Sequence, residues 1–148
     1  AVGCNLPSHI PQRMATRAQN LLESLGAPLD IRPLRTRSAS TGAGIFLTVE
    51  YAHGRGGASV LGRKGMPSEA VAERAVTELL ELHDRGASVD AYLADQLVIP
   101  LALAGGNSRI RTTQITPHLR TNINVVSAFI ETQISLDERQ RIVSFSAR

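Results

Sequence analysis

The sequence predicts a mixed α/β (α+β) protein, with helices and strands interspersed along a chain of 148 residues. Some segments repeat apolar residues at a spacing of three or four, which is typical of amphipathic helices, and others alternate apolar and polar residues, which is typical of half-buried strands. Glycine clusters separate these segments, as expected for turns. The hydrophobic content of 43% is sufficient for one ordinary domain or two small ones.

The first part of the chain, residues 1 to 88, is predicted to follow the order βαβββα. A short apolar strand runs to about Leu6. A helix starts at Ser8 and is closed by Gly26, since glycine commonly ends helices. Its apolar face is predicted to comprise Met14, Ala18, Leu21, Leu22 and Leu25.

Three strands and a second helix complete this part. Residues 29 to 37 and 43 to 52 are predicted strands, and the second of them alternates in apolar character. Its two faces carry Ile45, Leu47, Val49 and Tyr51 on one side and Phe46, Thr48 and Glu50 on the other. A turn at Gly54–Gly57 leads into a strand near 58 to 62. The helix after it begins near Pro67 or Ser68, ends at Gly86, and buries Val71, Ala75, Leu79 and Leu82.

The second part, residues 89 to 148, is predicted to begin with a buried helix. Residues 93 to 104 are apolar nearly all round, which calls for cover on several sides. Pro100 cannot donate a backbone hydrogen bond and should kink this helix. A strand near 108 to 114, a helix after His118, and strands at 131 to 137 and 141 to 146 follow.

Three side chains near the start of the buried helix form a candidate nucleotide site. On a helix beginning near Asp90, Tyr92, Asp95 and Gln96 stand at i, i+3 and i+4 and share one face. An aromatic plane, a carboxylate and an amide are suited to a base and its ribose. The alternative is a half-buried tyrosine and an aspartate beside the positive end of a helix.

His118 is the candidate nucleophile. It follows Pro117 and precedes a helical repeat of Leu119, Ile123, Val126 and Ile130. The start of a helix attracts phosphate through its unpaired N–H groups, and Thr121 and Asn122 can add donors. A neutral imidazole can attack phosphorus when its other nitrogen is oriented by a partner. The alternative is a capping or surface histidine.

The segments Tyr-Leu-Ala-Asp-Gln at 92 to 96 and Thr-Pro-His-Leu-Arg-Thr-Asn at 116 to 122 resemble the C-terminal signature of the RNA 3′-terminal phosphate cyclase family. The stretch 93 to 106, which ends in a glycine pair, matches that family almost residue by residue. Two weaker matches precede it, Gly3 to Ile10 and Gly65 to Leu80, in the family's order. The resemblance covers essentially the whole chain.

The resemblance implies a fold in which residues 1 to 88 form a small inserted α/β domain. Residues 89 to 148 would be the C-terminal part of the catalytic core, its last α/β unit. A family member is more than twice as long, so the chain is expected to be the C-terminal portion of an enzyme. We expect it to pair with the missing N-terminal portion or to self-associate.

The resemblance also implies a reaction. His118 would take AMP from ATP, giving a covalent histidine-AMP intermediate, and an RNA 3′-phosphate would end as a 2′,3′-cyclic phosphate. The nucleotide-binding residues would be Tyr92, Leu93, Ala94, Asp95 and Gln96, with Asp95 or Gln96 orienting His118. ATP and a divalent metal, Mg or Mn, are the expected cofactors, although no metal ligand is identified in this chain. The alternatives are a non-catalytic cyclase-like factor of ribosome biogenesis, or a structural module that contacts RNA.

Composition adds softer indications. The formal net charge is +3, and Lys64 is the only lysine among 16 basic residues. Arginine is the better bidentate phosphate ligand, so an RNA or nucleotide partner is plausible, although genome composition can produce the same bias. A single cysteine, Cys4, excludes an internal disulfide. No segment reaches the ~18 apolar residues of a membrane span, so we expect a cytoplasmic protein without membrane partners.

The remaining candidates favour structural roles. The glycine clusters at 54 to 57 and 62 to 65 lack the spacing of a phosphate-binding loop. The other histidines are expected near a helix start, in a turn and near a helix end: His9, His53 and His83. Arg109, Arg111 and Arg120 are candidates for meeting RNA or ATP phosphates, with solvated surface as the alternative.

Overall fold

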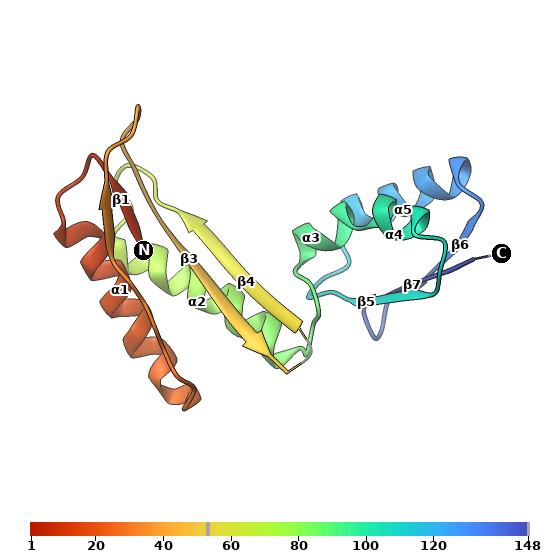
Figure 1. Ribbon diagram of the computed structural model, residues 1–148, viewed down its shortest axis with the longest axis horizontal. Coiled ribbons are helices and arrows are strands. Elements are labelled where there is room, and N and C mark those ends of the chain that lie inside the picture. Colours follow the sequence, from red (N-terminus) through yellow and green to blue (C-terminus); the bar gives the residue numbers. More distant parts are fainter. Residues whose placement is uncertain (53, 148) are drawn as a thin grey trace. The chain divides into compact units, whose positions relative to one another are not determined.

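The computed structural model describes residues 1–52 and 54–147, so the predicted turn position of His53 lies outside the described residues. The chain divides into two compact units. The first comprises Ala1–Tyr51 and Gly57–Leu80, and the second consists mainly of the residues from Glu81 onward. The protein is a mixed α/β fold with two sheets, as the sequence predicts (Figure 1).

The first unit has the predicted βαβββα order. Its elements are β1 Val2–Cys4, α1 His9–Leu22, a short 3₁₀ helix Glu23–Leu25, β2 Leu34–Thr36, β3 Gly42–Tyr51, most of β4 Gly54–Leu61 and most of α2 Ser68–Asp84, whose last turn belongs to the second unit. The strands form one sheet in the order β2-β1-β3-β4. Strand β1 runs parallel to β2 and antiparallel to β3.

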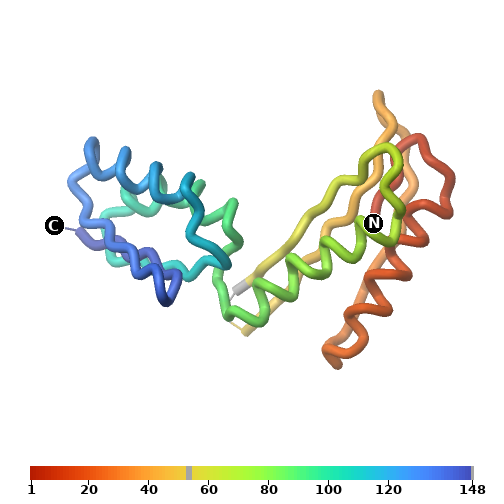
Figure 2. Tube along the Cα trace, turned by 180° about the vertical axis from the view of Figure 1, so that it is seen from behind, coloured from red at the N-terminus to blue at the C-terminus, as the bar shows by residue number. Residues whose placement is uncertain are grey.

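Both helices of this unit pack on one face of its sheet, as the tube view also shows (Figure 2). The buried side chains that form this core include Met14, Ala18, Leu22, Ile45, Leu47, Val60, Val71, Ala75 and Leu79. The alternation in β3 is as predicted, because Ile45 and Leu47 are buried whereas Phe46 is 68% exposed. Leu25 differs from the prediction and is exposed, since it lies in the 3₁₀ turn beyond α1. Gly26 ends that turn with a left-handed φ of 62°.

Two strand predictions in the first unit are wrong in extent. The strand predicted at 29 to 37 is reduced to Leu34–Thr36, because Pro28 and Pro33 lack the N–H that a sheet ladder needs. The turn predicted at Gly54–Gly57 is part of β4. A Cβ atom at Gly57 would lie 2.9 Å from the carbonyl oxygen of Leu47, so this glycine permits a close approach to β3 and does not form the turn.

The second unit places helices on one face of a three-stranded sheet (Figures 1 and 2). Its elements are α3 Ala91–Gln96, α4 Val98–Leu103, β5 Ser108–Arg111, α5 Pro117–Phe129, β6 Thr132–Asp137 and β7 Ile142–Ala147. The strand order is β5-β7-β6, and both pairings are antiparallel. The core between the layers includes Ala94, Val98, Ala102, Ile110, Leu119, Ile123, Val126, Val143 and Phe145.

The buried helix predicted at 93 to 104 is interrupted as expected, but not at Pro100. It divides into α3 and α4 at Leu97. A proline ring collides with the carbonyl of the residue four positions earlier, here Gln96, and leaves that carbonyl without its helical donor. The break therefore falls one turn before the proline.

Among the described residues, none of the helices is both long and apolar enough to cross a membrane.

Candidate functional site

The start of α3 is fixed by Asp90. Its Oδ1 accepts hydrogen bonds from the backbone N–H groups of Tyr92 at 2.8 Å and Leu93 at 2.7 Å. Asp90 itself has an extended backbone with ψ of 175°, which is the usual geometry of an N-cap residue. This cap determines where the segment from Tyr92 to Gln96 begins its first turn.

The start of α5 has a cap of the same kind. Thr116 Oγ1 accepts a hydrogen bond from the N–H of Leu119 at 3.0 Å, and Pro117 occupies the first helical position, where its missing N–H costs nothing. His118 follows directly, and Thr121 Oγ1 donates to the carbonyl of Pro117 at 3.0 Å. His118 is thereby held in the first turn of a helix whose next residue, Leu119, is fully buried.

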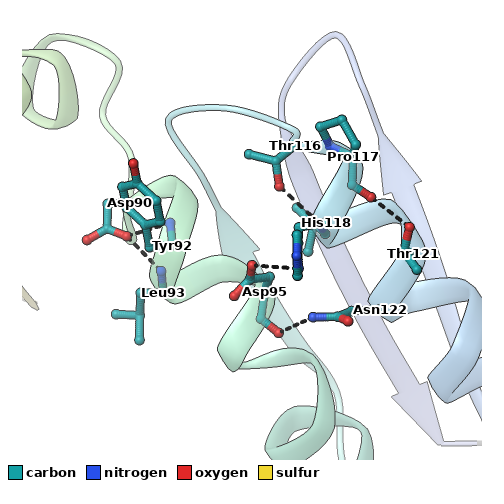
Figure 3. A network of polar contacts seen from close by, with 10 residues as sticks. Asp90, Tyr92, Leu93, Asp95, Thr116, Pro117, His118, Thr121 and Asn122 are labelled. Carbon is teal, nitrogen blue, oxygen red and sulfur yellow. Dashed lines mark hydrogen bonds and ion pairs between the residues drawn. The ribbon is translucent and has the colours of Figure 1, made fainter.

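A side-chain bond joins the two helices. Asn122 Nδ2 donates to the backbone carbonyl of Asp95 at 3.3 Å. Ala94 on α3 and Leu119 on α5 are both fully buried in the core of this unit. Asp95 and His118, which are 23 positions apart in the sequence, are therefore brought together by packing and by this bond (Figure 3).

Asp95 faces one ring nitrogen of His118. The distance from His118 Nδ1 to Asp95 Oδ2 is 3.7 Å, and the side chains are 84% and 19% exposed, respectively. This distance is longer than a hydrogen bond, so the contact is electrostatic, between a mostly buried carboxylate and an exposed ring. Nε2 lies on the other side of the imidazole from Nδ1, and an Nδ1 that faces a carboxylate favours the tautomer with a free lone pair on Nε2.

The other predicted nucleotide-binding residues are placed differently. Tyr92 is 72% exposed and Leu93 is 41% exposed, and Gln96 is exposed at the end of α3. Figure 3 shows the Tyr92 ring beside Asp90 at the start of α3, whereas Asp95 and His118 face each other across the two helices. Ala94 has no exposed surface, so its side chain belongs to the core. The structure thus brings Asp95, and not Gln96, against His118.

An ion pair lies on α5 two residues beyond the histidine. Arg120 pairs with Glu138. The hydrogen bond from Arg120 holds the pKa of the Glu138 carboxyl below its ordinary value, and the same bond raises the pKa of Arg120. Arg109 and Arg111 lie exposed on β5, and His9 and His83 lie at the start of α1 and in the last turn of α2, where the sequence places them.

Two features of the site were missed by sequence reasoning. The capping role of Thr116 could have been predicted, because threonine followed by proline at the start of an apolar repeat is typical of a helix N-terminus. Arg85 and Arg141, which line one pocket together with Arg120, had no such signal. Within the residues described here, no group of three or more His, Cys, Asp or Glu side chains is arranged to hold a metal ion.

Comparison with known proteins identifies relatives over the whole chain. The family model described as RNA 3′-terminal phosphate cyclase (RTC), insert domain, matches residues 1–84. A protein named RNA 3′-terminal phosphate cyclase from Gloeothece citriformis is 45% identical over 143 residues, which cover 97% of this chain and 41% of the relative. The protein of that name from Trichormus variabilis is 44% identical over 147 residues, covering 99% of this chain and 42% of the relative.

The similarity extends beyond these two relatives. The protein of the same name from Methylococcus capsulatus is 46% identical over 129 residues, covering 87% of this chain and 36% of the relative. The chain spans about two fifths of the length of the curated relatives it matches, and it corresponds to their C-terminal part. On these matches, the chain belongs to the RNA 3′-terminal phosphate cyclase family.

Proposed function

We propose that this chain supplies the C-terminal portion of an enzyme that converts an RNA 3′-terminal phosphate into a 2′,3′-cyclic phosphate at the expense of ATP. His118 is the nucleophile and carries AMP as a covalent intermediate. The observation that supports this most directly is the placement of His118 in the first turn of α5, with Nδ1 toward Asp95 and the ring largely exposed. The family's printed name, RNA 3′-terminal phosphate cyclase, supports the substrate.

The first step uses the two ring nitrogens differently. The proton sits on Nδ1, facing the Asp95 carboxylate, and the Nε2 lone pair attacks the α-phosphorus of ATP. The bond from that phosphorus to the bridging oxygen breaks, and pyrophosphate leaves. The ring becomes positively charged as the new N–P bond forms, and the nearby carboxylate stabilises this charge.

Asp95 acts as a positioning residue in this scheme. At 3.7 Å it is too distant for a hydrogen bond to Nδ1, and catalytic hydrogen bonds commonly tighten only when the substrate is bound. The hydrogen bond from Asn122 to the backbone carbonyl of Asp95 links α5 to α3, and it thereby keeps Asp95 close to His118.

The remaining residues of α3 serve the nucleotide. The exposed Tyr92 ring is available for stacking on adenine, and Leu93 and Gln96 offer apolar and amide contacts on the same short helix. Ala94 contributes through the backbone, because its side chain is buried. The first turn of α5 adds the favourable field of a helix N-terminus to the phosphate being attacked.

The later steps transfer AMP onward. An oxygen of the RNA 3′-phosphate attacks the phosphorus of the adenylate, and the N–P bond to His118 breaks. The neighbouring 2′-hydroxyl then attacks the activated 3′-phosphorus, which closes the ring and releases AMP. Splitting one difficult displacement into easier steps is the advantage of a covalent intermediate.

A divalent metal, Mg or Mn, would supply charge stabilisation on the triphosphate. Among the described residues, no cluster of three or more His, Cys, Asp or Glu side chains is arranged to hold this metal. Its ligands would come from ATP and from the rest of the enzyme.

The proposal is tested with a fusion of this chain to the unmatched N-terminal portion of the Gloeothece relative. We expect the fusion to convert RNA carrying a 3′-phosphate into a phosphatase-resistant cyclic end when ATP is present. His118→Ala should abolish this conversion, whereas His9→Ala, which changes an exposed histidine of the first unit, should leave it unchanged. Cyclisation by the His118→Ala fusion at the unmodified rate would contradict the proposal. The chain alone is expected to be a poor cyclase, because positioning supplies most of the rate in phosphoryl transfer.

A further inference from the structure

The second unit contains a charged pocket that the proposed chemistry does not use. It has a volume of about 470 Å³ and lies between the end of α2, the loop before α5, the first turns of α5 and the β6–β7 turn. Its lining is polar and charged: Glu81, Arg85, Thr113, Gln114, Ile115, Arg120, Glu138 and Arg141. A pocket of this composition is suited to an ion, not to an apolar ligand.

The charges in the pocket do not balance. Arg85 pairs with Glu81 at 2.9 Å, and Arg120 pairs with Glu138. Arg141 is in none of the ion pairs found among the described residues, so the three guanidinium groups and two carboxylates leave one positive charge in excess. This excess gives the pocket a net positive charge, which attracts an anion.

Arg141 also has a polar atom without a partner. Its Nε is buried and finds no hydrogen-bond acceptor within the described part of the chain. Its backbone has a φ of 55°, which an arginine rarely adopts, and its carbonyl accepts a hydrogen bond from the N–H of Thr112 at 3.0 Å. A buried guanidinium N–H normally has an acceptor. Nε lacks one and is closed to solvent, so a ligand in the pocket would reach Arg141 through the part of its side chain that lines the pocket.

We propose that this pocket binds a phosphodiester group of an RNA strand, with Arg141 as the principal ligand and Arg85 and Arg120 as supporting cations. Guanidinium groups match the spacing of phosphate oxygens and bind them through paired N–H groups. The two glutamates facing the pocket moderate the affinity, because each must share its arginine with the phosphate.

The pocket faces away from the reacting nitrogen. Arg120 follows His118 by two residues, which is a rotation of about 200° around a helix axis. A phosphate bound beside Arg120 therefore lies on the other side of α5 from the imidazole. This favours a phosphodiester of the RNA strand away from its reacting end, and it disfavours the triphosphate of an ATP whose α-phosphorus is at His118.

The inference rests on the proposed function only in taking RNA as the molecule that carries the phosphate. RNA binding is measured directly, so the test does not require a reaction with ATP. The complete 148-residue chain is titrated with a fluorescent single-stranded oligoribonucleotide, and anisotropy is recorded at several salt concentrations. Arg141→Gln should weaken binding roughly tenfold and lower the slope of log affinity against log salt by about 0.7, the value for one phosphate contact on a single strand. Arg139→Gln is the matched control. It makes the same charge change in the same turn, but Arg139 does not line the pocket, so its effect should stay within about twofold, as for ordinary exposed charges.

A second variant keeps the test decisive if Arg141→Gln disturbs the fold. Glu138→Gln frees Arg120 for the ligand and should tighten RNA binding several-fold, a gain that misfolding cannot produce. A parallel titration with ATP tests whether the pocket binds the phosphates of ATP instead of those of RNA. The affinity of the chain for ATP should not change in Arg141→Gln. Equal losses in Arg141→Gln and Arg139→Gln would overturn the proposal, as would weaker RNA binding by Glu138→Gln or a loss confined to ATP. Failure of His118 to accept AMP would refute the proposed function but leave this binding result standing.

Discussion

At the scale of single residues, Asp95 and His118 are the pair on which the proposed chemistry depends. Asp95 is the less exposed partner, with 19% of its side chain accessible against 84% for His118. A carboxylate in that position restricts the ring orientation and favours the proton on Nδ1. In the proposed mechanism Asp95 therefore positions the ring and does not contact the α-phosphate.

This role predicts the effect of Asp95→Asn. In the fusion enzyme, the amide should lower the rate of AMP transfer to protein by roughly tenfold, equivalent to about 1.4 kcal/mol of transition-state stabilisation. The KM for ATP should change much less, because the carboxylate does not bind the nucleotide. Single-turnover labelling measures both quantities, and Asp30→Asn, in the first unit, is the control. An Asp95→Asn enzyme with unchanged labelling would remove Asp95 from the mechanism.

Sequence reasoning reached part of this site. Helical spacing placed Tyr92, Asp95 and Gln96 on one face of a helix and His118 at or just before the start of another. It did not distinguish Asp95 from Gln96 as the neighbour of the histidine, because that depends on how α3 and α5, which are distant in the sequence, pack together. Arg141, which lines the charged pocket, was missed because a turn residue carries no periodic signal.

At the scale of elements, the helix starts determine where the functional side chains stand. Thr116 and Asp90 each satisfy N–H groups that a helix cannot satisfy internally. The cap at Thr116 fixes the first turn of α5 and with it the backbone position of His118.

Thr116→Ala should therefore destabilise the chain by about 1 kcal/mol, the usual cost of losing a threonine cap. Urea unfolding followed by circular dichroism measures the change in the free energy of unfolding, and Thr116→Ser should restore most of it. Thr77→Ala is the matched control, because Thr77 lies inside α2 and its hydroxyl bonds to the carbonyl of Glu73. Alanine is the better helix former there, so stability should be equal or higher. A Thr116→Ala chain as stable as the unsubstituted one would show that the cap contributes nothing.

An ion pair between α1 and α2 predicts a pH dependence. Arg13 Nε donates to Glu69 Oε1 at 2.7 Å, and this hydrogen bond holds the pKa of Glu69 below the ordinary value of 4.5. A carboxyl with a lowered pKa stabilises the fold above its unfolded value, and that stabilisation is lost as the pH falls through the folded value. The contribution is small because both groups are exposed.

Glu69→Gln should therefore lower the melting temperature slightly at pH 7, and the difference from the unsubstituted chain should disappear in acid, at a pH below the folded pKa of Glu69. Arg13→Gln should have the same effect at pH 7, and the double variant should be no worse than either single one. Thermal melts at the two pH values measure this. Additive losses in the double variant, or a difference that persists in acid, would contradict the account.

Much of the element order was accessible from sequence, because both helix and strand periodicities are strong in this chain. Helices α1, α2 and α5 and strands β3, β6 and β7 follow the predicted positions closely. The errors occur where the local sequence is compatible with two different structures. Glycines at 54 to 57 are compatible with a turn or with a strand that approaches its neighbour closely. The backbone of Gly57 lies so near the carbonyl oxygen of Leu47 that a Cβ atom would not fit, which is the geometry of a close strand.

At the scale of the whole molecule, the helices of the second unit expose several large apolar side chains. The exposed apolar residues on its helices are Tyr92, Leu93, Ile99, Leu103, Val125 and Phe129. Leu103 is 66% exposed and Phe129 is 85% exposed. The chain spans about two fifths of its relatives, and the remainder of such a protein is the natural cover for these side chains.

The chain should accordingly associate, either with the N-terminal portion of a relative or with itself. Light scattering after size-exclusion chromatography should show a mass above that of one chain at high concentration. Adding the N-terminal portion of the Gloeothece relative should replace that species with a one-to-one complex. Ile99→Gln with Leu103→Gln should weaken both associations, whereas Leu61→Gln, an exposed apolar residue of the first unit, should not. A chain that stays monomeric and ignores the N-terminal portion would contradict this.

The identity of the adenylated residue tests the account most directly. The fusion enzyme is incubated with ATP labelled in its α-phosphate, digested, and its labelled peptide is sequenced by mass spectrometry. We predict one adduct on His118, labile in acid and stable in base, that is absent from His118→Ala and unchanged in His9→Ala. Label that persists in His118→Ala, or that maps to His9 or His83, would show that the nucleophile lies elsewhere. A folded fusion that binds ATP but forms no labelled adduct would favour a non-catalytic member of the family.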